Sequence, residues 1–156
     1  MMACLAVSLM TDDLLCATVS VRAVIENTRG EVLTVQRSSD HDWELPGGRL
    51  SRGEPPREGL HREVREETGL TVEIAEIVKA NSWINTAGDG RFAVHYYCET
   101  TDYSVTLSDE HVDSKWVLPR QVEQSLCDSQ IDAVQITMAE TDGTSEKTTN
   151  PSATQD

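Results

Sequence analysis

The segment from Gly48 to Leu70, GRLSRGEPPREGLHREVREETGL, constrains the fold of this chain more than any other stretch. Paired prolines near its start and Gly69 near its end bound a run in which Leu60 and Val64 fall on one helical stripe. We therefore expect a helix from Pro55 to Thr68.

Short runs of β-branched and apolar residues, separated by turn residues, surround this helix and predict strands. The runs are Thr18–Glu26, Val32–Gln36, Trp43–Leu45, Val72–Ala80, Phe92–Glu99 and Lys115–Leu118. The turn at 27–30 predicts a hairpin of the first two runs. Trp83 and a turn at 88–90 predict a second hairpin or meander of the fourth and fifth. Two weaker helix candidates follow, at Arg120–Leu126 and Gln130–Ala139.

The length of 156 residues suits one globular domain. From Glu140 onward, polar residues without apolar partners dominate, which is typical of disorder. We expect an N-terminal extension over residues 1–16, a single domain over 17–139 and a disordered acidic and polar tail over 140–156.

The chain carries 27 acidic and 13 basic residues, a net charge of -14. Such a surface repels nucleic acid backbones and anionic membranes, so we exclude duplex nucleic acid and membranes as partners. The charge suits a protein kept soluble at high salt, and it equally suits an ordinary acidic cytosolic enzyme.

The four cysteines, Cys4, Cys16, Cys98 and Cys127, form no CxxC pair. We therefore expect reduced thiols and neither a disulfide framework nor a zinc site. The apolar run Met1–Met10 lacks a preceding basic residue and is too short to span a bilayer. A cytoplasmic location is the resulting expectation.

Three carboxylates, Glu63, Glu66 and Glu67, are spaced so that a helix places them on one face. Taken alone, a solvated acidic face explains them. Arg62 lies four residues from both Glu58 and Glu66 and is able to hold Glu66 through a forked hydrogen bond. Hard oxygen ligands without histidine or cysteine suit Mg²⁺ or Mn²⁺, which bind carboxylates together with substrate phosphates.

The flanking residues decide between these interpretations, because the segment resembles the Nudix box, G(x5)E(x7)REU(x)EE(x)GU with U aliphatic. Every specified position is filled, by Gly48, Glu54, Arg62, Glu63, Val64, Glu66, Glu67, Gly69 and Leu70. The preceding Trp43–Gly48 and the later Glu110 and Trp116 resemble the family as well. Gly59 and Leu60 depart from it, since many members carry two alanines there; we take Gly59 as a sign of tight packing against the sheet.

The resemblance implies an α/β fold, an α/β/α sandwich around a mixed β-sheet with the box as loop, helix and loop. It also implies roles for the box residues. Glu63, Glu67 and the carbonyl of Gly48 would bind the metal, with Glu66 a third ligand or the residue that polarises the attacking water. Arg62, which we also count with the catalytic group, and Glu54 would hold the loop against the helix and aim the carboxylates.

Outside the box the assignments have equal or stronger alternatives. Glu110, in a loop able to swing over the site, is a general base, an additional ligand or a surface acid. Arg37 either contacts substrate phosphate or is a surface arginine. Trp83 is the aromatic residue assigned to substrate binding, although Trp83, Tyr97 and Trp116 are each more typical of core than of base stacking. None of the four histidines has metal-ligand spacing.

The resemblance therefore implies a Mg²⁺-dependent or Mn²⁺-dependent hydrolase that cleaves a phosphate anhydride in a nucleoside triphosphate, ADP-ribose or a related nucleotide. Dinucleoside polyphosphates are further candidate substrates, and the absence of proline from Thr71–Asn85 weakens ADP-ribose. The main alternative is a catalytically silent module that senses a nucleotide. A diphosphate isomerase of related fold is a further alternative, but the chain is short for that family. A homodimer is compatible with the family.

Overall fold

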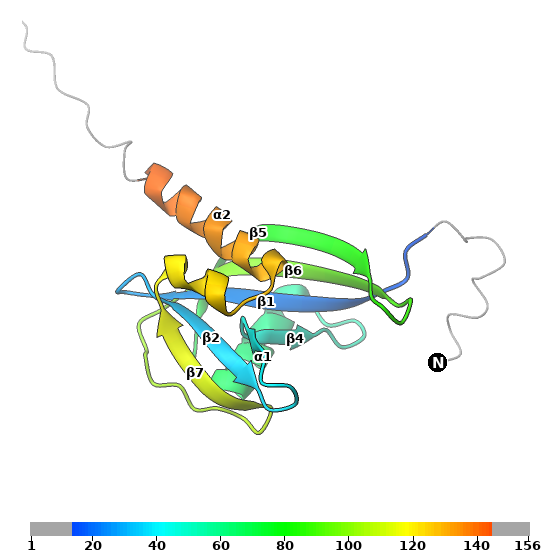
Figure 1. Ribbon diagram of the computed structural model, residues 1–156, viewed down its shortest axis with the longest axis horizontal. Helices are drawn as coiled ribbons and strands as arrows, with labels where there is room; N and C mark the ends of the chain where they lie inside the picture. Colours follow the sequence, from blue (N-terminus) through cyan, green and yellow to red (C-terminus); the bar gives the residue numbers. More distant parts are fainter. Residues whose placement is uncertain (1–13, 145–156) are drawn as a thin grey trace, which may run out of the picture.

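The computed structural model describes residues 14–144, in which a mixed sheet lies between two helices (Figure 1). Within this range the sheet has seven strands, in the order β3-β2-β1-β6-β5, with β4 paired to β1 and β7 paired to β2. The strands are β1 (Ala17–Asn27), β2 (Val32–Arg37), β3 (Trp43–Glu44), β4 (Gly47–Arg49), β5 (Glu73–Ile84), β6 (Gly90–Thr100) and β7 (His111–Val117). The helices are α1 (Pro56–Thr68), the 3-10 helix η1 (Pro119–Gln124) and α2 (Asp128–Thr144). The predicted α/β sandwich around a mixed sheet is confirmed.

The central strand β1 supplies side chains to both layers. It runs parallel to β6 from the pair Ala17↔Gly90 to the pair Asn27↔Thr100, whereas the other strand pairs are antiparallel. Alternate side chains of a strand face opposite sides of the sheet. Val21 and Ile25 accordingly pack with the apolar stripe of α1, and Val24 packs with the buried residues of α2 and η1.

The helix α1 forms as predicted, beginning at Pro56 with Pro55 as its N-cap. It ends at Gly69, whose φ of 71° lies in the left-handed region that glycine adopts readily. Leu60 and Val64 are fully buried, so this stripe fixes the rotation of the helix against the sheet.

The first predicted hairpin forms only at its turn. β1 and β2 share the single pair Glu26↔Val32 and then separate, because β4 pairs with β1 at the positions a full hairpin would give to β2. β2 pairs instead with β7. This divergence places the glycines of β4 beside the middle of β1.

The second predicted hairpin is confirmed, with β5 and β6 antiparallel. β5 continues past Ala80 to Ile84, so Trp83 belongs to the strand and pairs with Arg91. The turn also lies earlier than predicted, because the Asn85 side-chain oxygen accepts the backbone N–H groups of Ala87 and Asp89.

The C-terminal region differs from the prediction in its boundaries. Arg120–Leu126 was expected as a helix and forms a 3-10 helix that starts at Pro119, while α2 starts two residues before Gln130. α2 continues to Thr144, four residues past the expected start of the tail at Glu140, and the rest of the expected tail lies outside the described residues. Most of the expected N-terminal extension, including Cys4, also lies outside them.

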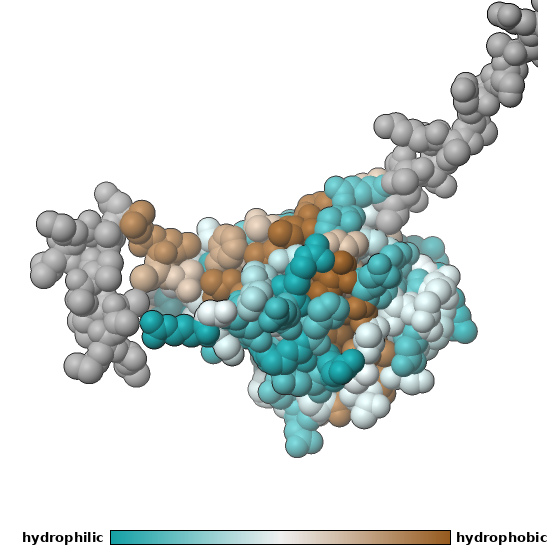
Figure 2. All heavy atoms as spheres, turned by 180° about the vertical axis from the view of Figure 1, so that it is seen from behind, coloured by the Kyte–Doolittle hydropathy of each residue, from teal (hydrophilic) through white to brown (hydrophobic). Residues whose placement is uncertain are grey.

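In the described part of the chain no disulfide joins Cys16, Cys98 and Cys127, and no helix is long and apolar enough to cross a bilayer. Seen from behind, the surface is largely hydrophilic with apolar areas between the polar ones (Figure 2). Leu14 and Trp83 are among the exposed large apolar side chains.

Candidate functional site

A cavity of about 1050 Å³ lies where the glycines of β4, the acidic face of α1, the sheet and the first residues of α2 meet. Every residue predicted for the site except Glu54 lines it. These residues are Arg37, Gly48, Arg62, Glu63, Glu66, Glu67, Trp83 and Glu110. Positions far apart in the sequence therefore converge on one space.

The two glycines of β4 allow two close contacts, Gly47 with the backbone of β1 and Gly48 with Glu63 of α1. A side chain at Gly47 would overlap the backbone carbonyl of Val21, and the φ of 143° at Gly47 itself favours glycine. A side chain at Gly48 would overlap the carboxylate of Glu63. Glycine at 48 thus brings that carboxylate against the main chain of the loop.

Glu67 is the buried member of the acidic face, with 4% of its surface exposed. Its carboxylate accepts the backbone N–H of Gly47 at 2.9 Å. Burial raises the pKa of Glu67 to about 8, and the charges of Glu44 and Glu63 add to the increase, although Gly47 and Arg22 oppose it. A cation beside Glu67 would favour its charged form.

Arg62 ties the acidic face to the preceding loop. It donates to both carboxylate oxygens of Glu54, at 2.7 and 2.9 Å, and once each to Glu63 at 2.9 Å and Glu66 at 3.2 Å. The forked pair was expected on Glu66 and forms on Glu54 instead, because the loop before α1 folds back beside the arginine. This pairing, together with a hydrogen bond from the Ser51 backbone, lowers the pKa of Glu54 to about 2.

The three carboxylates of the box face the same cavity but have different partners. Glu63 and Glu66 share Arg62, whereas Glu67 is bound by Gly47. Among the residues that the structure describes, no three acidic, histidine or cysteine side chains form a ready-made metal site. The expected trio is therefore brought to one place without being closed around a common point.

Gly59 allows a close contact, but with a different partner from the one expected. A side chain there would overlap the tip of Leu50 and approach the Glu54 carboxylate. The glycine therefore packs against the loop after β4, which carries the arginine-bound Glu54, and the nearest neighbours are not sheet residues.

Glu110 lines the cavity from the start of β7. The segment SDEHVDSKW was expected to be a loop able to swing over the site, but residues 111–117 form a strand paired with β2. The backbone carbonyl of Glu110 accepts the N–H of Ser38 at 2.9 Å. The side chain of Glu110 is exposed while its backbone is anchored.

Arg37 and Trp83 lie at different parts of the cavity wall. Arg37 contacts the carboxylates of Asp40, Asp42 and Glu44, and its pKa is raised chiefly by the hydrogen bond with Asp40. Trp83 is 45% exposed, so part of its ring is accessible. The other two aromatic candidates do not line this cavity: Tyr97 donates to Glu26 and Glu99, and Trp116 packs edge-on against Tyr103.

Several wall residues were not singled out from the sequence. Arg22 and His95 face the cavity from β1 and β6, Asn81 faces it from β5, and Glu44 faces it from β3. Arg22 was detectable as a charge within an apolar strand, and Glu44 as an acid between Trp43 and Leu45. His95 is 2% exposed and its Nδ1 has no hydrogen-bond partner in the described structure.

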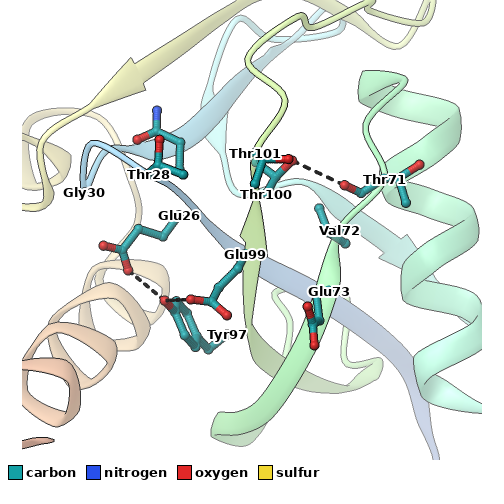
Figure 3. Close-up of a pocket in the computed structure, with 11 residues that line it drawn as sticks. Glu26, Thr28, Gly30, Thr71, Val72, Glu73, Tyr97, Glu99, Thr100 and Thr101 are labelled. Atoms are coloured by element: carbon teal, nitrogen blue, oxygen red, sulfur yellow. Dashed lines mark hydrogen bonds between the residues drawn. The ribbon is translucent and has the colours of Figure 1, made fainter.

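A separate pocket of about 620 Å³ lies at the other end of β1 and β6 and contains none of the predicted site residues (Figure 3). Tyr97 points between Glu26 and Glu99 and donates to them at 3.0 and 3.2 Å. Threonines from the segments after α1 and β6 complete the wall. None of the described residues that line this pocket is a lysine or arginine that could bind a phosphate.

Comparison with known proteins adds an independent finding. A family model described as the NUDIX domain matches residues 17–136. A MutT-like protein of Streptomyces ambofaciens is 34% identical over 110 residues, which cover 70% of each chain. An RNA pyrophosphohydrolase of Pseudoalteromonas translucida is 38% identical over 66 residues, which cover 42% of this chain and only 38% of that protein.

Among solved structures, a MutT protein from Methanosarcina mazei superimposes with a TM-score of 0.71 at 28% identity, covering 81% of this chain and 96% of that one. The residues that the family model matches include all seven strands, α1, the first part of α2 and all of the predicted site residues.

Proposed function

Because the chain belongs to the Nudix family of pyrophosphohydrolases, we propose that it uses Mg²⁺ or Mn²⁺ to hydrolyse a phosphate anhydride in a nucleotide or nucleoside diphosphate derivative. One observation carries the proposal. Glu63, Glu66, Glu67 and Glu110 line a single cavity that also contains arginines. Carboxylates beside arginines are what a site for a cation and an anionic phosphate substrate requires.

The residues present fit a divalent cation. Glu63 and the buried Glu67 would supply carboxylate oxygens, and the Glu63 carboxylate lies close to Gly48, whose carbonyl is the further oxygen ligand that we propose. Burial raises the pKa of Glu67 to about 8, so a cation beside it would favour the charged carboxylate. When bound, the cation lowers the pKa of the attacking water and neutralises charge on the departing phosphate.

The chain's own residues then position the attacking water and accept its proton. Water attacks one phosphorus in line, a P–O bond forms and the bridging P–O bond breaks, so the leaving phosphate departs with the bridging oxygen. Glu66 and Glu110 are the two candidates to accept the water proton. Arg62 holds Glu63 and Glu66 through hydrogen bonds, which restricts their rotamers before substrate binds.

The cavity favours a substrate with both an anionic and a flat polar part. Arg22, Arg37 and Arg91 supply positive charge along the wall, and the accessible ring of Trp83 lies with Asn81 on β5. Nucleoside triphosphates and ADP-ribose both have this composition. The proposed location of the enzyme is the cytoplasm, where such nucleotides are available.

The alternative is a module that binds a nucleotide derivative without hydrolysing it. Retention of every box glutamate favours hydrolysis. The deciding experiment is an assay with Mg²⁺ and with Mn²⁺ over nucleoside triphosphates, ADP-ribose and dinucleoside polyphosphates, run in ¹⁸O-water. We expect cation-dependent turnover with label in one phosphate product; binding of a panel member without turnover would establish the sensing module.

Substitution of Glu66 by Gln tests its assigned role. Because Glu66 is exposed and has only one bond to Arg62, the fold should be unchanged, while kcat should fall by about 10² or more. Steady-state kinetics and a thermal melt measure the two quantities. Near wild-type turnover in Glu66→Gln would remove this residue from the mechanism.

A further inference from the structure

We propose that Glu44 is a positioning residue that holds two separate parts of the site together, the glycine loop (residues 45–48) and Glu110. The kinetic part of this inference rests on the function proposed above. The structural part stands on contacts of Glu44 alone and is tested without turnover.

The side chain of Glu44 is 8% exposed and lies among three nitrogen-bearing side chains. Its Oε2 atom is 3.0 Å from Nη1 of Arg22 and 3.3 Å from Nη1 of Arg37, and its Oε1 atom is 3.3 Å from Nε2 of His111. These three residues come from β1, β2 and β7. One buried carboxylate therefore joins three strands.

The Arg22 contact connects Glu44 to the glycine loop. The same Nη1 atom donates to the carbonyl of Leu45 at 3.0 Å and to that of Gly47 at 3.3 Å. The N–H of Gly47 in turn binds the Glu67 carboxylate. Arg22 thus binds the carbonyl of Gly47 while Glu67 binds its N–H, and Glu44 supplies the charge that keeps the guanidinium there.

The His111 and Arg37 contacts connect Glu44 to Glu110. His111 is the residue after Glu110, and its side chain is only 1% exposed. Arg37 pairs with His111 across the irregular register of β2 and β7, and the next residue, Ser38, donates its N–H to the Glu110 carbonyl. The Glu44 carboxylate therefore contacts His111, which follows Glu110 in the chain, and Arg37, which precedes the residue that binds the Glu110 carbonyl.

Removing the charge of Glu44 should loosen both connections at once. Arg22, with 19% side-chain exposure, would lose its charged partner and keep only carbonyl acceptors. The amide oxygen of a glutamine at position 44 is a weaker hydrogen-bond acceptor for the guanidinium groups of Arg22 and Arg37 than a carboxylate. A substitution of His111 removes one of the two contacts that connect Glu44 to Glu110 and leaves the contact between Glu44 and Arg22 in place. This difference separates a shared anchor from general stability.

Amide hydrogen exchange on the metal-free full chain measures the coupling directly. In Glu44→Gln we expect the amides of both Gly47 and Ser38 to exchange about tenfold faster or more, whereas His111→Asn should affect Ser38 and leave Gly47 unchanged. Glu26→Gln is the matched control, because Glu26 accepts a hydrogen bond from Tyr97 at the separate pocket. Unchanged exchange at either amide in Glu44→Gln would overturn the proposal. If Glu44→Gln fails to fold, His111→Asn remains the test. It should speed amide exchange at Ser38 and leave exchange at Gly47 unchanged, and the absence of this difference would also overturn the proposal.

Kinetics add a second test once a substrate is known. Glu44→Gln should lower kcat by about tenfold or more with KM changed less than about threefold, and this effect should shrink in the Glu110→Gln background, because part of it acts through Glu110. Full additivity of the two substitutions would contradict the link to Glu110. A wild-type chain that hydrolyses nothing would refute the proposed function and leave the exchange result standing.

Discussion

At Gly48 the carboxylate of Glu63 occupies the space that any side chain would fill. The box requires glycine here for a steric reason, since no positive φ is involved. The same crowding explains why a residue on β4 and a residue on α1 are able to serve one site.

Replacing Gly48 with Ala should displace Glu63 and lower kcat/KM by about 10² or more, because misplacement of a site residue by about 1 Å has effects of that size. Gly53→Ala is the contrast: nothing lies within 4 Å of its added atom, and its φ of 76° costs stability of about 1 kcal/mol without touching the cavity. Steady-state kinetics and denaturant unfolding separate the two effects. Equal activity losses in both variants would rule out the steric explanation.

At the residue scale, spacing predicted which side chains share a site but not their partners. The interval of four between Arg62 and Glu66 is real, yet the arginine binds Glu54 more closely, eight residues away, because the loop folds back. Glu44 lies in the segment Trp43–Gly48 that resembles the family, but nothing in the sequence indicates its partners. Its partners come from three strands that only the tertiary fold brings together.

At the scale of elements, the buried stripe of α1 keeps the acidic face turned toward the cavity. Leu60→Ala should lower the free energy of unfolding by about 2–5 kcal/mol, the usual cost of a cavity at a fully buried leucine. Leu14→Ala, at a position 74% exposed, should change it by less than about 0.5 kcal/mol. Chemical denaturation measures both values, and a small loss in Leu60→Ala would mean that the helix is held by its polar contacts.

The elements were predictable where periodicity was strong, as in α1, β1 and the β5–β6 hairpin. The first hairpin was wrong beyond its turn because adjacent strands in sequence usually pair, whereas here β4 competes for the edge of β1. β7 was predicted too short because its first residues, His111 to Ser114, are mostly polar and gain their strand geometry from pairing with β2.

At the scale of the whole molecule, burial of polar groups around the cavity makes stability depend on pH. Burial, together with Arg22 and Lys79, lowers the pKa of His95 from 6.5 to about 4. Between these values the unfolded imidazole binds more protons than the folded one, so the contribution of His95 to stability falls as the pH is lowered from 6.5 toward 4. The loss is about 3 kcal/mol. Glu67, with its raised pKa of about 8, contributes in the opposite direction, because there the folded chain binds the extra proton.

Thermal or urea unfolding of wild type and His95→Gln across this pH range measures the contribution. The variant should lose less stability on acidification, whereas the matched substitution of the exposed His61 by Gln should behave as wild type. Identical pH profiles for wild type and His95→Gln would show that the buried imidazole is not the group responsible.

Calorimetric titration of Mn²⁺ into the metal-free chain measures whether the acidic face of α1 binds a divalent cation. Wild type and Glu58→Gln, an exposed acid on the same helix outside the cavity, should bind the ion alike. Glu63→Gln and Glu67→Gln should each weaken binding by about tenfold or more. Equal affinity in all four proteins, or no binding to wild type in the presence of a nucleotide, would show that the acidic face of α1 is not the cation site.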